Sequence, residues 1–191
     1  MTRERLEGIA AVNAAPAGTT LLGPLFEDSP RFLERLLAAR PFESWDALWA
    51  RAREIAHAMP EDEQIELLNA HPRLGAPRDR VSALSAREQG YDRPAGEGAI
   101  AGPAGEAAIG GPSPATAGRL AELNDAYEAR FGFRYCVFVA GRPLEALLPD
   151  FEAALAADRD SELHRGLDAV VDIARARNGA ITTAGLDRGG A

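Results

Sequence analysis

Two short polar motifs carry the side chains best suited to catalysis. The first is His71-Pro72-Arg73-Leu74-Gly75, and after a short gap comes Ser85-Ala86-Arg87-Glu88-Gln89. The first motif predicts an imidazole at the end of a helix that a proline stops. The second predicts the start of the next helix and places a carboxylic acid beside a carboxamide. Together they offer a proton-transfer group, an acid to tune it, and amide donors for a small polar substrate.

Helical spacing distinguishes His71 from the other two histidines. His71 lies four residues after Leu67 and three after Leu68, so we expect it on the face that these leucines bury. His57 lies off the Trp45/Trp49 stripe and is expected to face water, and His164 is expected beside the apolar stripe of its helix. Taken alone, His71 also fits a simpler role, in which it caps the helix and donates to a terminal carbonyl.

The second motif likewise has two interpretations. Ser85 and Glu88 have the spacing of a capping box, in which the two side chains satisfy backbone donors at a helix start. Capping does not explain Gln89. A carboxylate and an amide together can bind a flat, nitrogen-rich ligand, and the carboxylate can orient a nearby imidazole.

Arg177 is the third candidate. It lies seven residues after Val170 and four after Ile173, which places it on the apolar face of the last predicted helix. A buried guanidinium is costly unless it meets an anion. It could form a structural ion pair, extend to solvent, or hold a substrate carboxylate, and the spacing leaves these alternatives open.

Composition excludes several classes of protein. The chain has 191 residues and a net charge of −8, which argues against nucleic-acid binding. No apolar run approaches the length of a membrane helix, and the sequence indicates a cytoplasmic protein. One cysteine, Cys136, gives no internal disulfide, and the sequence has no metal-ligand spacing. We therefore expect no metal and no cofactor.

Most of the chain has helical periodicity, so the predicted fold class is all-α, a single-domain helical bundle. Ser44, Ser29-Pro30 and Ser113-Pro114 are predicted helix starts, and Gly132 is a predicted helix end. Four apolar stripes support the helices: Trp45, Leu48, Trp49, Ala52, Ala56; Leu120, Leu123, Tyr127, Phe131; Leu144, Leu147, Leu148, Phe151, Leu155; and Leu163, Leu167, Val170, Ala174.

Three segments depart from this helical pattern. Residues 135–139 are β-branched and aromatic, which predicts a short extended segment packed among the helices. Residues 93–113 contain a duplicated Gly/Ala/Pro unit, from Ala95 to Pro103 and from Ala104 to Pro112, which predicts a flexible surface insertion, with a functional lid as the alternative. One domain is expected over residues 1–183, followed by a disordered tail at 184–191.

Ordered motifs along the chain resemble those of the 2-oxo-4-hydroxy-4-carboxy-5-ureidoimidazoline (OHCU) decarboxylases. The resemblance runs from about Phe26 to Arg177 and includes the two motifs above. Its other blocks are Phe26-Glu27-Asp28-Ser29-Pro30, Arg40-Pro41-Phe42, and Leu123-Asn124-x-x-Tyr127-x-x-Arg130-Phe131-Gly132-Phe133.

This resemblance implies an all-α homodimer that decarboxylates an anionic ureide to (S)-allantoin in urate degradation, without a cofactor. His71 matches the catalytic proton donor and Glu88 its acidic partner. The matching substrate contacts are Pro72, Ser85, Ala86, Arg87, Glu88, Gln89, Tyr135, Cys136, Val137, Phe138, Val139 and Arg177. The chain departs from the family at Arg134, where a proline is common, and at Tyr135-Cys136, which replace phenylalanine-valine.

Two other functions are compatible with these residues. A related decarboxylase or lyase could act on another small ureide, because the residues define the type of reaction better than the ring. A non-catalytic helical binding module would use His71 as a cap and Ser85 and Glu88 as a capping box. An enzyme requires His71, Glu88 and Arg177 to line one pocket, whereas a module requires separate surroundings.

Overall fold

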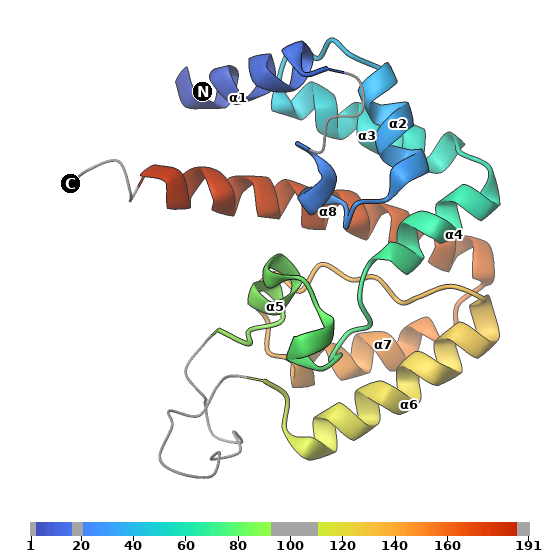
Figure 1. The fold of residues 1–191 in the computed structure, drawn as a ribbon. Coiled ribbons are helices and arrows are strands. Elements are labelled where there is room, and N and C mark those ends of the chain that lie inside the picture. The colour runs from blue at the N-terminus through green and yellow to red at the C-terminus, as the bar shows by residue number, and fades with distance from the viewer. Residues whose placement is uncertain (1–2, 17–20, 93–110, 187–191) are drawn as a thin grey trace. The chain divides into compact units, whose positions relative to one another are not determined.

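The computed structural model describes residues 3–16, 21–92 and 111–186 (Figure 1), and the regular elements in these ranges are all helical. This confirms the predicted all-α class. The α-helices are α1 (Arg3–Ala14), α2 (Pro30–Ala38), α3 (Trp45–Ala58), α4 (Glu61–Ala70), α5 (Ala83–Glu88), α6 (Pro114–Phe131), α7 (Leu148–Ala154) and α8 (Arg159–Leu186). Three short 3₁₀ turns join them: η1 (Gly23–Leu25), η2 (Arg78–Arg80) and η3 (Leu144–Leu147).

The chain folds as two compact units, one of residues 1–70 and 163–191, the other of residues 71–162. We call them the terminal unit and the central unit. Each has its own buried apolar side chains. The expectation of one domain over residues 1–183 stays a prediction.

The terminal unit packs α1 to α4 with the greater part of α8. Its apolar core includes Phe26, whose ring lies 4.8 Å from that of Phe32 and 6.3 Å from that of Trp49. Arg53 of α3 binds two carboxylates of α8, Asp168 at 2.6 Å and Asp172 at 2.8 Å. These contacts hold the long last helix against α3.

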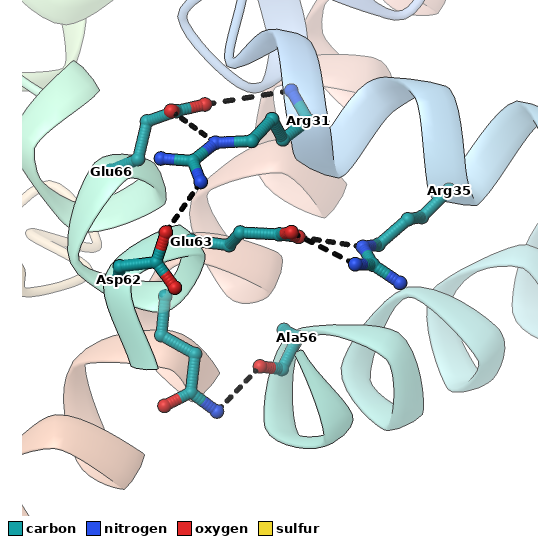
Figure 2. Close-up of polar contacts among 7 residues, drawn as sticks. Arg31, Arg35, Ala56, Asp62, Glu63 and Glu66 are labelled. Carbon is teal, nitrogen blue, oxygen red and sulfur yellow. Dashed lines mark hydrogen bonds and ion pairs between the residues drawn. The ribbon is translucent and has the colours of Figure 1, made fainter. Parts of the chain in front are cut away.

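Ion pairs also join α2 to α4 in the terminal unit (Figure 2). Arg31 binds both Asp62 and Glu66, and the Arg35 guanidinium contacts both carboxylate oxygens of Glu63, at 2.6 and 2.8 Å. The acidic first turn of α4 is favourable at a helix N-terminus and here also meets basic partners. The contacts therefore fix the helix whose last residue, Ala70, directly precedes His71.

The core of the central unit is an aromatic cluster around Tyr127 of α6. The Tyr127 ring is fully buried and makes edge contacts with the rings of Phe131, Phe133, Tyr135 and Phe151. Its hydroxyl donates to Glu162 Oε2 at 2.7 Å. Four of these rings come from one short stretch of sequence, which explains how the non-helical chain after α6 is held in place.

Most predicted helix boundaries are confirmed. Ser44 and Ser113 cap α3 and α6 by accepting from Ala47 N and Thr116 N, both at 3.1 Å. Gly132 ends α6 with φ +82°, a left-handed conformation that glycine adopts without strain. The stripe from Leu144 to Leu155 spans two elements, because the chain forms η3 and then restarts as α7. Pro149 lies in the first turn of α7, where its missing N–H is tolerated.

The ends of two predicted irregular segments can also be placed. Helix α8 continues to Leu186, so residues 184–186, predicted as part of the tail, are helical. Residues 187–191, and residues 93–110 of the predicted insertion, lie outside the described residues.

Candidate active site

His71 occupies the predicted position at the end of a helix. It follows Ala70, the last residue of α4, and its side chain is buried at 3% exposure. Its backbone carbonyl accepts a hydrogen bond from Arg134 Nη1 at 2.8 Å. The prediction that His71 is buried at the C-terminal end of this helix is therefore confirmed.

The loop after His71 is anchored at successive residues. The Leu74 carbonyl accepts from Asn124 Nδ2 of α6 at 3.0 Å, and Gly75 N donates to Gln89 Oε1 at 2.7 Å. One residue further, the Ala76 carbonyl accepts from the Tyr91 hydroxyl at 2.7 Å. These contacts come from α6 and from the end of α5, so the loop is fixed between them.

Two features shape this loop further. Arg73 forms a bidentate ion pair with Glu128 of α6, with N···O distances of 2.8 and 2.7 Å, and also binds Asp125. Gly75 has φ +76°, and a Cβ added there would lie 2.6 Å from Leu120 Cδ1. Glycine is required here both by conformation and by close approach to α6.

The expected placement of the second motif at a helix start was wrong. Helix α5 begins three residues earlier, where Ser82 is the N-cap and its Oγ accepts from Ser85 N at 3.1 Å. Glu88 is the last residue of the helix and Gln89 follows as its C-cap. Ser85 and Glu88 therefore do not form a capping box, because Ser85 already lies inside the helix.

The residues of this motif differ in exposure. Ser85, Ala86 and Gln89 are buried, and Glu88 is half-buried. Arg87 is exposed, and its Nε lies 3.6 Å from Asp92. The first motif and Gln89 are thus in direct contact, whereas the Arg87 side chain is directed to the surface.

Residues 135–139 form neither a helix nor a strand, and Tyr135, Cys136 and Val139 are buried. The Tyr135 ring stacks on Phe151 with centroids 3.8 Å apart. Arg142 donates to the carbonyls of Phe138 and Val139, each at 3.2 Å. Among the described residues, the backbone N–H groups of Val137, Phe138 and Val139 donate to no acceptor. These N–H groups could therefore bind a ligand.

A groove of about 480 Å³ lies along residues 72–77, within the central unit, and His71, Glu88 and Arg177 are not among its lining residues. Its lining combines small side chains with charged ones and includes Arg134. Arg80 is exposed, and Arg73 and Glu128 are already paired with each other. The lining residues are Pro72, Arg73, Leu74, Gly75, Ala76, Pro77, Arg80, Ala117, Ala121, Asn124, Glu128 and Arg134.

Arg177 lies in the terminal unit and faces inward, as its spacing predicted. Its side chain is 2% exposed and its Nη2 lies 2.8 Å from Glu27 Oε1. Its Nη1 donates to the carbonyls of Pro24 and Leu25, at 3.1 and 3.3 Å. A structural ion pair, one of the alternatives from the sequence, is therefore present. The role of Arg177 in binding a substrate carboxylate stays a prediction.

Several supporting residues were not predicted as functional. Asn124 and Tyr91 anchor the loop after His71, and Glu27 pairs with Arg177. Glu27 and Asp28 both have positive φ, +49° and +55°, which is unusual for residues other than glycine. Asn124 and Glu27 lie in motifs that carried the family resemblance, so the signal was present, but a motif does not show which partner a side chain meets.

The helices and the polar clusters of the described residues exclude two further kinds of site. No helix there combines the length and apolar character that crossing a membrane requires. In the same residues, no group of three or more His, Cys, Asp or Glu side chains is arranged to hold a metal ion.

Comparison with known sequences identifies related proteins. The profile of the family described as OHCU decarboxylase matches residues 13–178. The chain is 32% identical over 165 residues to the uric acid degradation bifunctional protein PucL of Bacillus subtilis, covering 86% of this chain but only 30% of PucL. It is 26% identical over 155 residues to the 2-oxo-4-hydroxy-4-carboxy-5-ureidoimidazoline decarboxylase of Haloferax volcanii, covering 81% of this chain and 83% of that protein.

Solved structures show the same fold. A crystal structure of OHCU decarboxylase in the presence of (S)-allantoin aligns with a TM-score of 0.64 at 19% identity, over 87% of this chain and 99% of that one. A crystal structure of (S)-allantoin synthase aligns with a TM-score of 0.57 at 20% identity, over 88% of this chain and 52% of that one. At this level of identity, the structural comparison establishes the fold.

Proposed function

The chain belongs to the OHCU decarboxylase family, and from this premise we propose that it is a carboxy-lyase that converts OHCU to (S)-allantoin in urate degradation. The observation that carries the site assignment is the hydrogen bond between Gly75 N and Gln89 Oε1. It joins the two motifs that supply the proposed proton donor and its acidic partner.

The proposed reaction requires no external electron acceptor. The substrate carboxylate is attached to a ring carbon that bears a hydroxyl and lies next to an imine carbon. When the bond to CO₂ breaks, its electron pair forms a carbon–carbon double bond, and the imine nitrogen takes up a proton. The resulting enol then gains a proton on carbon and loses its hydroxyl proton to become a carbonyl. The residues must therefore orient the carboxylate and control the face that is protonated.

In this proposal His71 delivers the proton to carbon, and Glu88 orients either the imidazole or the substrate hydroxyl. Burial of His71 supports the role, because a proton donor shielded from water acts on one face of the intermediate. Pro72 and the residues from Ser85 to Gln89 contribute the proposed walls of the site, with Gln89 also holding the loop.

Residues 135–139 contact the substrate mainly through their backbone. The Tyr135 ring is occupied in the aromatic cluster, so its side chain serves packing. The N–H groups of Val137, Phe138 and Val139, which donate to no described residue, are suited to bind developing negative charge. The replacement of the family's usual phenylalanine-valine by Tyr135-Cys136 is compatible with contacts of this kind.

Arg177 is the proposed partner of the substrate carboxylate. Its guanidinium is planar and presents several N–H groups in a fixed fork, which suits recognition of a carboxylate. The ion pair with Glu27 and the two backbone carbonyls fix the orientation of this fork in the terminal unit. Homodimer formation and a cytoplasmic location stay predictions from the sequence.

The test is turnover of urate that a urate oxidase has freshly oxidised, followed by circular dichroism with and without this protein. The proposal expects faster formation of optically active allantoin when the protein is present. Other ureido acids, supplied in parallel, test whether a different small ureide is the substrate. Turnover of none of these compounds by the folded protein would contradict the proposal and favour a binding module.

A further inference from the structure

The carbonyl of His71 is held by a side chain from a distant part of the sequence. Arg134 Nη1 donates to it at 2.8 Å, across 63 positions of the chain. This carbonyl lies at the end of α4, where the last carbonyls of a helix have no partner inside the helix. A hydrogen bond from a charged donor is shorter and stronger than one between neutral groups. The contact therefore restrains the backbone that carries the imidazole.

The other anchors of the loop act on later residues. Asn124 holds Leu74, Gln89 holds Gly75, and Tyr91 holds Ala76. Within this set of contacts, the one from Arg134 acts on His71 itself. Loss of this contact would leave the rest of the loop anchored, so the expected effect is a local displacement of His71.

Arg134 also lies next to the second part of the proposed site. It directly precedes residues 135–139, and Tyr135 is fixed by stacking on Phe151. The aromatic cluster thus holds the backbone from which Arg134 extends. One guanidinium consequently links the backbone of the proposed proton donor to the segment proposed to contact the substrate.

We infer that Arg134 is a positioning residue of this chain, which sets the place of His71 through the hydrogen bond to its backbone carbonyl. The inference rests on the proposed function, because it assumes that His71 delivers the proton.

The test compares three variants of the full chain in the decarboxylation assay. Arg134→Met keeps much of the side chain's apolar length but removes the donor, and Arg134→Lys restores a single charged donor. Arg159→Met is the matched control, because Arg159 Nε also donates to a backbone carbonyl in the central unit, that of Phe131 at 3.0 Å. Thermal unfolding of each variant measures stability separately from kcat and KM.

The expected result is a kcat about 10-fold lower for Arg134→Met with KM nearly unchanged, since a displaced proton donor slows the chemical step more than binding. Arg134→Lys recovers most of this loss. Arg159→Met retains a kcat within roughly twofold of the wild type even if its Tm falls. If Arg134 only stabilised the fold, Arg134→Met would lower Tm without a selective fall in kcat at nearly unchanged KM.

Two results would overturn the inference. One is a wild-type kcat for folded Arg134→Met. The other is an equal loss of kcat in Arg134→Met, Arg134→Lys and Arg159→Met that follows their loss of Tm. Measurement of His71→Ala in the same assay separates this inference from the proposed function. If His71→Ala is inactive and Arg134→Met is unaffected, only the inference fails. If His71→Ala is fully active, the role assigned to His71 fails as well.

Discussion

The carboxamide of Gln89 accepts a hydrogen bond from the backbone N–H of Gly75 at 2.7 Å, and this contact joins two motifs that are separate in sequence. Gln89 is buried at 9% exposure. If its side chain were removed, water would poorly replace the acceptor of the Gly75 N–H. The pair holds the loop after His71 against the end of α5. It therefore explains why a carboxamide follows the glutamate in the second motif.

Replacement of Gln89 by alanine should both destabilise the protein and reduce its activity. The Gly75 N–H would lose its acceptor, at a cost of about 1–3 kcal/mol in the free energy of unfolding. Looser positioning of the loop should also lower kcat/KM. Urea unfolding and the decarboxylation assay measure the two effects.

Gln64→Ala is the control for the Gln89 variant. Gln64 is a buried carboxamide of the terminal unit that donates to the carbonyls of Ala56 and His57, both at 3.0 Å (Figure 2 draws the Ala56 contact). It should lose stability while kcat/KM stays near the wild-type value. Equal losses of kcat/KM in the two variants would show that Gln89 has no particular link to the site.

A pair of glycine substitutions should have opposite effects on stability. Gly75 has φ +76°, and a Cβ added there would lie 2.6 Å from Leu120 Cδ1. Gly75→Ala should therefore lower the free energy of unfolding by about 1–3 kcal/mol. Gly118 lies within α6, and no atom is within 4 Å of a Cβ added there. Gly118→Ala should therefore raise the free energy of unfolding by roughly 0.5–1 kcal/mol. Chemical denaturation of both variants checks this, and destabilisation by Gly118→Ala would contradict it.

Tyr127→Phe should destabilise the central unit without a large change in volume. Removal of the hydroxyl deprives Glu162 Oε2 of a donor at 2.7 Å, and the Glu162 side chain is buried. A lost hydrogen bond to a charged group costs about 1.5–3 kcal/mol. The fall in Tm should come with retention of helical circular dichroism. An unchanged Tm would mean that this pair contributes nothing to stability.

Stability should decline in alkaline solution partly because of Tyr91. Burial raises the pKa of the Tyr91 phenol above its usual value of 10.0, and the neutral hydroxyl donates to the Ala76 carbonyl. Since the folded-state pKa is the higher one, the contribution of Tyr91 is complete below pH 10 and is lost as the pH rises toward the folded-state pKa. The free energy of unfolding should therefore fall less between pH 8 and 10.5 in Tyr91→Phe than in the wild type. Identical declines in the two proteins would exclude this role.

Periodicity and caps predicted much of the fold because they report local physics. The stripe from Leu120 to Phe131 faces the core, and Gly132 ends that helix as expected. The neighbouring sequence alone could not predict where α5 begins, because Ser82 and Ser85 are both suitable N-caps. Burial of Ser85 in the tertiary structure accompanies the earlier start.

The residues of the candidate site were easier to predict from the sequence than the contacts that they make. Spacing placed His71 at a helix end and Arg177 on a buried face, and both positions are confirmed. The partners of these residues are far away in sequence, as in the contacts of Arg134 with His71 and of Glu27 with Arg177. Spacing along one element carries no information about such pairs, so the structure was needed to find them.

The most direct test of the account is the rate of (S)-allantoin formation by His71→Asn, measured on freshly oxidised urate at protein concentrations matched to the wild type. Asparagine is polar and smaller than histidine, and it cannot act as an acid at neutral pH. If His71 delivers the proton, kcat should fall by about 10²-fold or more while the helical circular dichroism is retained. A folded His71→Asn protein that forms (S)-allantoin at the wild-type rate would contradict the account.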